Sequence, residues 1–83
     1  MKVRLFGGDS CPICELALLK IECEKDKFEH EYIDAFADEF QELCDENKVD
    51  ELPHIQFFDD EDKIAEEFSG IDVLNVLRDI CGW

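Results

Sequence analysis

Residues 2–24 read KVRLFGGDSCPICELALLKIECE, in which two glycines separate a short apolar run from a cysteine pair. The run Lys2–Gly7 is short and ends at glycine, which favours a β-strand over a helix. From the C-P-I-C motif at residues 11–14 to about Glu24, apolar residues recur at the three- and four-residue spacing of an amphipathic helix. This stretch therefore predicts a strand followed by a helix that begins at the cysteine pair.

The rest of the chain continues to alternate between strand-like and helix-like patterns. The further predicted elements are a strand over 28–33, a helix from about 36 to 47, strands over 54–58 and 63–66, and a helix over 71–81. Ser69 and Asp72 stand at the spacing of a capping box ahead of the last helix. Trp83, at the end of the sequence, is expected to cover apolar surface.

The order of these elements is β-α-β-α-β-β-α, which predicts an α/β fold. A strand, helix and strand in succession form a parallel pair joined by a right-handed crossover. The acidic turn after residue 58 adds an antiparallel hairpin. We therefore expect a mixed four-stranded sheet flanked by three helices, in a single domain over residues 1–83.

Charge and cysteine usage narrow the classes of function. The 23 Asp and Glu residues against 8 Lys and Arg give a net charge of −15, which argues against nucleic acid and anionic membranes as partners. No apolar run approaches the roughly 20 residues of a membrane span, and no signal segment follows Met1. Five cysteines are an odd set for a secreted disulfide framework. We expect a soluble, cytoplasmic monomer with mostly reduced thiols.

The cysteine pair is the candidate chemical centre. Proline is favoured at the first position of a helix, so Pro12 places Cys11 at the N-cap and Cys14 one turn further on. The unpaired N–H groups and the dipole of the helix start stabilise a thiolate there. Cys11 would attack a substrate disulfide, and Cys14 would then release the reduced substrate. Asp9, being anionic, would oppose ionisation of the thiol if it lies close.

A zinc site is the alternative reading of a C-x-x-C motif. Zinc usually takes four ligands, often from two such pairs, and this chain has one. Three other cysteines each fall on the apolar stripe of a predicted helix, where a free cysteine acts as a small hydrophobe: Cys23, Cys44 and Cys81. We therefore expect no bound metal.

Taken together, these motifs resemble the glutaredoxins of the thioredoxin-fold superfamily. The C-P-I-C motif is close to the C-P-Y-C of dithiol glutaredoxins, with Ile13 in place of tyrosine. Leu52-Pro53 stands where the family has a cis-proline beside the active-site cysteine. The segment at residues 69–72 (SGID) is similar to the one that holds the γ-glutamyl end of glutathione. The resemblance covers essentially the whole chain.

The resemblance implies a dithiol thiol–disulfide oxidoreductase with no bound cofactor, which reduces protein or glutathione mixed disulfides. Glutathione would be its co-substrate, or a thioredoxin-reductase type of flavoprotein its electron donor; ribonucleotide reductase is a partner by analogy. The catalytic residues would be Cys11 and Cys14. The implied substrate contacts are Pro12, Ile13, Leu52, Pro53, Gly70, Ile71 and Asp72.

The sequence departs from the family pattern where glutathione's glycyl carboxylate would meet cations. Gly7 stands in place of a common lysine, and Asp50 and Glu51 stand in place of a basic residue and a threonine. Weak binding of anionic glutathione is therefore expected.

Two other functions fit the same fold. One is a non-catalytic binding module that docks a basic partner through its acidic surface. The other is a carrier of an iron–sulfur cluster, against which Pro12 speaks because it stiffens the loop that must open around the iron.

Overall fold

The computed structural model describes residues 2–8, 11–24 and 26–82, so the expectations for Asp9 and Trp83 lie outside it. Its elements in chain order are β1 (Lys2–Gly7), α1 (Pro12–Cys23), β2 (Glu29–Asp34), the 3-10 turn η1 (Asp38–Phe40), α2 (Gln41–Glu46), β3 (His54–Phe58), β4 (Ile64–Ser69) and α3 (Ile71–Cys81). None of the described helices is long and apolar enough to cross a membrane.

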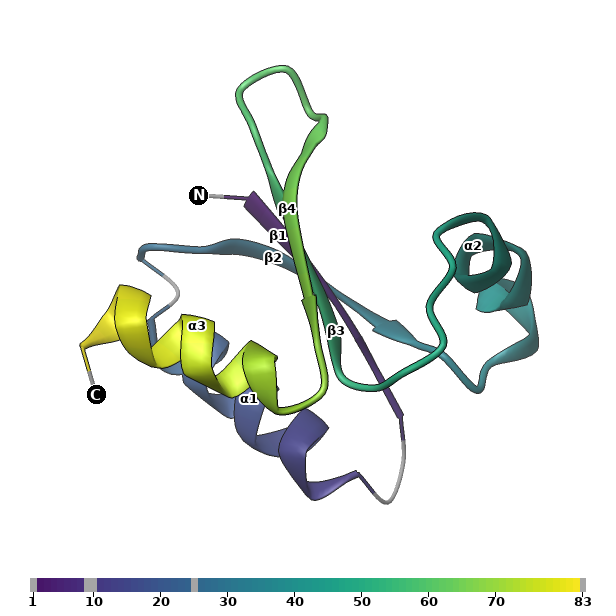
Figure 1. The fold of residues 1–83 in the computed structure, drawn as a ribbon, viewed down its shortest axis with the longest axis horizontal. Helices are drawn as coiled ribbons and strands as arrows, with labels where there is room; N and C mark the ends of the chain where they lie inside the picture. Colours follow the sequence, from purple (N-terminus) through teal and green to yellow (C-terminus); the bar gives the residue numbers. More distant parts are fainter. Residues whose placement is uncertain (1, 9–10, 25, 83) are drawn as a thin grey trace.

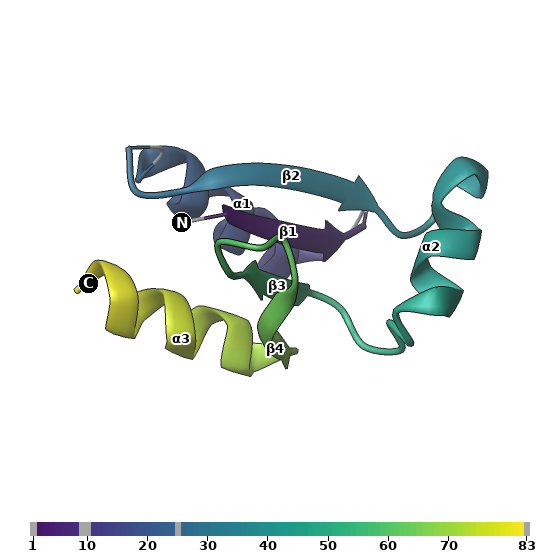
Figure 2. The same ribbon diagram turned by 90° about the horizontal axis from the view of Figure 1, so that it is seen from above.

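The strands form one mixed sheet in the order β2-β1-β3-β4 (Figures 1 and 2). β1 pairs in parallel with β2 and antiparallel with β3, which pairs antiparallel with β4. The parallel pair is joined through α1, and the antiparallel β3–β4 pair is a hairpin. The predicted mixed four-stranded sheet with three helices is confirmed.

The main core lies between the sheet and the two long helices, α1 and α3, which pack on the same face (Figure 1). Alternation along β1 sends Val3 and Leu5 to this face. Its fully buried members from the helices are Ala17, Ile21, Val73 and Leu77. Burial of these side chains fixes where α1 begins relative to the end of β1.

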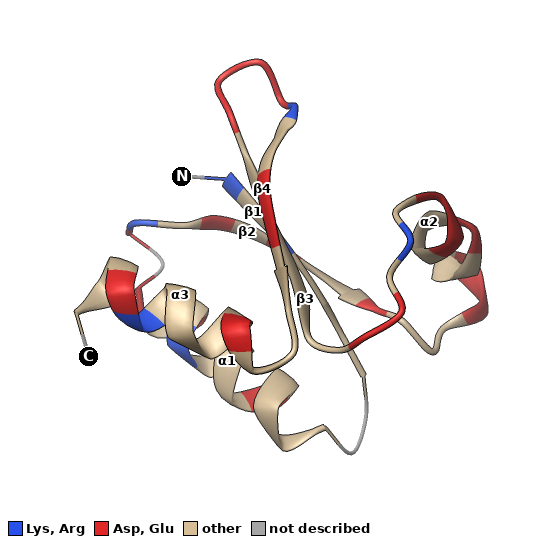
Figure 3. Cartoon of the chain, in the orientation of Figure 1, with Lys and Arg blue, Asp and Glu red and all other residues tan. Residues whose placement is uncertain are grey.

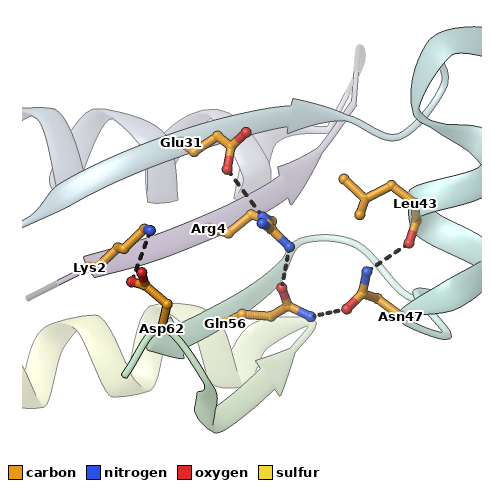
Figure 4. Close-up of polar contacts among 7 residues, drawn as sticks. All are labelled: Lys2, Arg4, Glu31, Leu43, Asn47, Gln56 and Asp62. Carbon is orange, nitrogen blue, oxygen red and sulfur yellow. Dashed lines mark hydrogen bonds and ion pairs between the residues drawn. The ribbon is translucent and has the colours of Figure 1, made fainter. Parts of the chain in front are cut away.

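The opposite face of the sheet has a smaller core and a polar network. Phe6 and Ile33 pack against Cys44 of α2, at the end of the sheet where β1 and β2 finish. Further along this face, the buried Gln56 links three neighbours, of which Figure 4 shows Arg4 and Asn47. Its Nε2 donates to Asn47 Oδ1 and Glu67 Oε1, each at 2.9 Å, and its Oε1 accepts from Arg4 Nη1 at 3.4 Å.

The prediction of a helix from about residue 36 to 47 is wrong in its first turn. The structure has η1 and the six-residue α2 instead, and Phe36 precedes both with 65% of its surface exposed. The Asp34 carboxylate accepts the N–H of Phe36 at 2.9 Å, which closes a turn after β2. Ala37 is then extended, so the helical pattern in the sequence begins before the helix does.

Two other expectations are wrong. The capping box is absent: Gly70 is the N-cap of α3, and within the described part of the chain no side-chain hydrogen bond caps that helix. Gly70 has φ +63°, a conformation that glycine adopts readily, so the backbone itself makes the turn into α3. Cys23 is exposed at the end of α1 rather than part of its apolar stripe, whereas Cys44 is buried as expected.

Candidate active site

Five elements meet at one end of the sheet and bring the predicted site residues to the same edge. The register pairs Phe6 of β1 with His54 of β3, and His54 with Ser69 of β4. The start of β3 and the end of β4 therefore lie beside the end of β1, which leads into α1 (Figure 1). The N–H of Gly70 donates to the carbonyl oxygen of Pro53 at 2.8 Å, which ties the start of α3 to the start of β3.

Cys11 and Cys14 are joined by a disulfide at the start of α1, with their Cα atoms 5.2 Å apart. Cys11 is the N-cap and Pro12 is in the first turn, as predicted. The backbone N–H of Cys14 donates to Cys11 Sγ at 3.2 Å. Cys14 is 1% exposed and Cys11 is half-buried, so an attacking group reaches the Cys11 sulfur first.

Cys14 lies close to Gly7, at the end of β1. A Cβ at Gly7 would lie 3.2 Å from the Cβ of Cys14 and 2.8 Å from the hydroxyl oxygen of Tyr32, so a side chain there would force the Tyr32 ring to shift. The sequence predicts Gly7 as the end of a strand, and the resemblance places it where a lysine is common. The structure adds that the missing side chain leaves room for Cys14 and the ring of Tyr32.

The segments next to the disulfide carry exposed apolar side chains, one of which the sequence patterns do not place there. The exposed ring of Phe36 lies directly over Gly8, so that a Cβ at Gly8 would overlap it. Ile71 at the start of α3 and Leu16 in α1 are 57% and 41% exposed. The sequence signal for Phe36 is an aromatic residue shortly after a strand, but its helical spacing predicts a position in a helix instead.

The Leu52–Pro53 peptide bond is cis, as the resemblance implied. Pro53 is buried, and the half-buried Leu52 packs against the smaller core. Of the other expected contact residues, Ile13 is half-buried, whereas Pro12 and Asp72 are exposed in the first turns of α1 and α3. That these residues contact a substrate stays a prediction.

Carboxylates dominate the charge at this edge (Figure 3). Five of them belong to segments that begin or end here: Glu15, Asp34, Asp50, Glu51 and Asp72. The Glu51 carboxylate lies directly over Gly70, whose missing Cβ would overlap it. Among the described residues, no three His, Cys, Asp or Glu side chains are grouped as a metal site.

His54 follows Pro53, but its side chain lies on the opposite face of the sheet from Cys14. Its ring packs edge-on against Phe6, with the centroids 5.7 Å apart, and its Nε2 lies 3.0 Å from Glu67 Oε1. The side-chain hydrogen bond from Gln56, followed by that from His54, lowers the pKa of Glu67 below the ordinary value for a glutamate carboxyl. His54 is therefore part of the polar network around Gln56 and is not placed to act on the disulfide.

No family model matches the chain, and no curated protein matches it by sequence. Several solved structures match its fold. Oxidised thioredoxin O2 from Arabidopsis thaliana superposes with a TM-score of 0.73 at 19% identity, over 98% of this chain and 72% of that one. Thioredoxin 1 from Thermosipho africanus gives 0.70 at 22% identity, over 100% of both chains.

A third match, a chain from the complex of ferredoxin:thioredoxin reductase with thioredoxin f2, gives a TM-score of 0.77 at 17% identity, over 98% of this chain and 74% of that one. The fold is thus thioredoxin-like, with an adjacent cysteine pair in the disulfide form at the start of α1. The three matches are thioredoxin structures, so the finer resemblance to glutaredoxins stays a prediction.

Proposed function

We propose that the protein is a dithiol thiol–disulfide oxidoreductase that acts through Cys11 and Cys14. One observation carries the proposal: the disulfide stands at a helix N-terminus with one sulfur accessible and the other buried. The N–H of Cys14, which meets Cys11 Sγ in the oxidised protein, is placed to stabilise a Cys11 thiolate after reduction.

In the reduced protein, the Cys11 thiolate attacks one sulfur of the substrate disulfide. A mixed disulfide forms, and the first substrate sulfur leaves as a thiolate that takes up a proton. The Cys14 thiol then loses its proton, and its thiolate attacks Cys11 Sγ. The Cys11–Cys14 disulfide re-forms and the second substrate sulfur leaves. Two electrons pass from the dithiol to the substrate, so a donor must reduce the protein again.

A protein reductase is the donor we propose, in preference to glutathione. Gly7, Asp50 and Glu51 stand where the resemblance calls for cations or a neutral residue, and the Glu51 carboxylate covers Gly70 at the start of α3. Glutathione is anionic and would meet carboxylates there. The fold match to a complex of a thioredoxin with its reductase supports the same choice. Donation of electrons to ribonucleotide reductase stays an expectation by analogy.

Reduction of insulin disulfides, with dithiothreitol as the donor, tests the proposed activity. Wild-type protein should accelerate the reaction, and Cys11→Ser should remove the acceleration. Cys14→Ser should accumulate a mixed disulfide with the substrate, visible by mass spectrometry. Cys23→Ser, which changes an exposed cysteine at the other end of α1, is the matched control and should behave as wild type. No acceleration by wild-type protein would favour the binding module.

A further inference from the structure

We propose that this site acts preferentially on disulfides that carry positive charge, and that Glu51 is the residue that sets the preference. The proposal rests on the proposed oxidoreductase function and names its substrate class. Three features carry it: the distribution of charge, the position of the Glu51 side chain and the exposed apolar side chains of the segments that meet at this edge.

The edge that carries the disulfide is acidic, and the described cations lie mostly elsewhere (Figure 3). Lys20 and Arg78 stand in the last turns of α1 and α3, the ends of these helices away from the disulfide. Four other described cations lie in β1, before β2 and in the hairpin: Lys2, Arg4, Lys27 and Lys63. Lys48, which follows α2, is the described cation at the same end of the sheet as the acidic edge. An approaching anion is therefore repelled at this edge and a cation is attracted.

Glu51 removes the feature of this edge that would otherwise attract an anion. The start of the eleven-residue α3 carries the partial positive charge of a helix N-terminus, and no side chain of α3 caps it. The Glu51 carboxylate lies against Gly70, the N-cap residue, with its Cδ 3.1 Å from the position that a Cβ there would take. The protein therefore supplies its own anion at the place where an anionic ligand would bind.

The segments that meet at this edge also carry exposed apolar side chains, which suits a protein segment rather than a free ion as the substrate. Pro12 and Leu16 are exposed in α1, Ile71 at the start of α3, and Phe36 over Gly8 after β1. A disulfide whose neighbours are apolar, with lysine or arginine further along the chain, would place its apolar groups on these side chains and its cations near Glu15 and Glu51.

Three small disulfides test the preference: cationic cystamine, neutral bis(2-hydroxyethyl) disulfide and anionic 3,3′-dithiodipropionate. The rate constant for each with pre-reduced protein is divided by the rate constant with dithiothreitol, which corrects for the leaving thiol. At low salt the normalised rate should be about tenfold higher for the cation than for the anion. High salt should bring the three together, because it screens exposed charges beyond about 10 Å.

The paired variants Asp50→Asn/Glu51→Gln and Asp60→Asn/Glu61→Gln assign the preference to this edge. Both remove two charges from an adjacent Asp-Glu pair, but the second pair lies in the hairpin turn that follows Phe58, at the opposite end of the sheet. The first variant should lose most of the cation-to-anion ratio, and Glu51→Gln alone should lose more of it than Asp50→Asn. The second variant should keep the ratio.

The outcomes separate this proposal from the function on which it rests. Equal normalised rates for the three disulfides, each faster than an unfolded cysteine peptide gives, would overturn the charge preference and leave the oxidoreductase standing. Equal losses in both double variants would mean that net charge, and not Glu51, sets the preference. Rates no faster than the peptide, even with the neutral disulfide, would overturn the proposed function itself.

Discussion

The backbone N–H of Cys14 points at the sulfur of Cys11, 3.2 Å away, so the disulfide is part of the cap of its own helix. A helix N-cap normally accepts such a bond through an oxygen of Ser, Thr, Asp or Asn. Here a sulfur does so, and we expect the same N–H to face this sulfur after the disulfide is reduced.

Reduced Cys11 should therefore react with iodoacetamide at a pH where an ordinary exposed thiol does not. The pKa of a thiol at a helix N-terminus lies well below the usual value of about 8.5, so its thiolate forms at lower pH. Mass spectrometry of peptides labelled across pH 4 to 9 would measure the alkylation of Cys11 and, as the internal control, of exposed Cys23. Parallel curves for the two residues would contradict the role given to the cap.

Gly7→Ala should destabilise the protein by about 1–3 kcal/mol, because a methyl group there overpacks a filled site. The new carbon would lie 2.8 Å from the Tyr32 hydroxyl oxygen and 3.2 Å from the Cβ of Cys14. Urea unfolding of the oxidised protein measures the loss. In a Tyr32→Ala background the same substitution should cost less, since the nearest obstacle is gone; an equal cost in both backgrounds would argue against this packing.

Stability should fall as the pH drops below 4.5, the ordinary pKa of the Glu67 carboxyl, because hydrogen bonds from Gln56 and then His54 hold its pKa lower in the folded protein. In that range the unfolded chain binds the proton more readily, so acid favours unfolding. Gln56→Leu removes the first donor and Glu67→Gln the carboxyl. Both variants should show a shallower loss of urea stability between neutral pH and pH 3.5 than wild type. An unchanged slope in both would rule out Glu67 as a source of the acid sensitivity.

The three free thiols of the oxidised protein should differ in reactivity. Cys23 is exposed, Cys81 is partly exposed and Cys44 is buried. Desolvation, with the neighbouring Asp45 carboxylate as a second cause, raises the pKa of Cys44, so its thiolate is scarce as well as shielded. Labelling with N-ethylmaleimide at pH 7.5 should follow the order Cys23, Cys81, Cys44. Labelling of Cys44 at the rate of Cys23 would show that α2 opens readily from the sheet.

Local signals in the sequence predicted the framework of this fold. Alternation and helical spacing depend on neighbours within one turn or one strand, and Pro12 marks a helix start whatever surrounds it. The wrong predictions lie where the backbone and side-chain contacts of a turn, rather than a periodic pattern, determine the structure. Phe36 follows helical spacing, but Asp34 closes a turn on it. Gly70 makes the turn that the Ser69 and Asp72 pattern was expected to make.

The reactive residues of the candidate site could be predicted from the sequence, but the residues that pack around them could not. The C-P-I-C motif indicated the cysteine pair and which sulfur is accessible. The contacts of Gly7 with Tyr32 and of Glu51 with Gly70 join residues about 20 or more positions apart. They depend on the register of the strands, which no local pattern specifies.

Both outer strands of the sheet carry paired acidic residues, Glu29 and Glu31 on β2 and Glu66 and Glu67 on β4, and all four are exposed. The outer side of an edge strand offers backbone groups with which a second chain could pair, and charged side chains oppose such pairing. Two copies that met along these edges would bring rows of carboxylates together. These carboxylates are part of the net charge of −15, and we expect their mutual repulsion to keep the folded chains apart at high concentration until acid neutralises them.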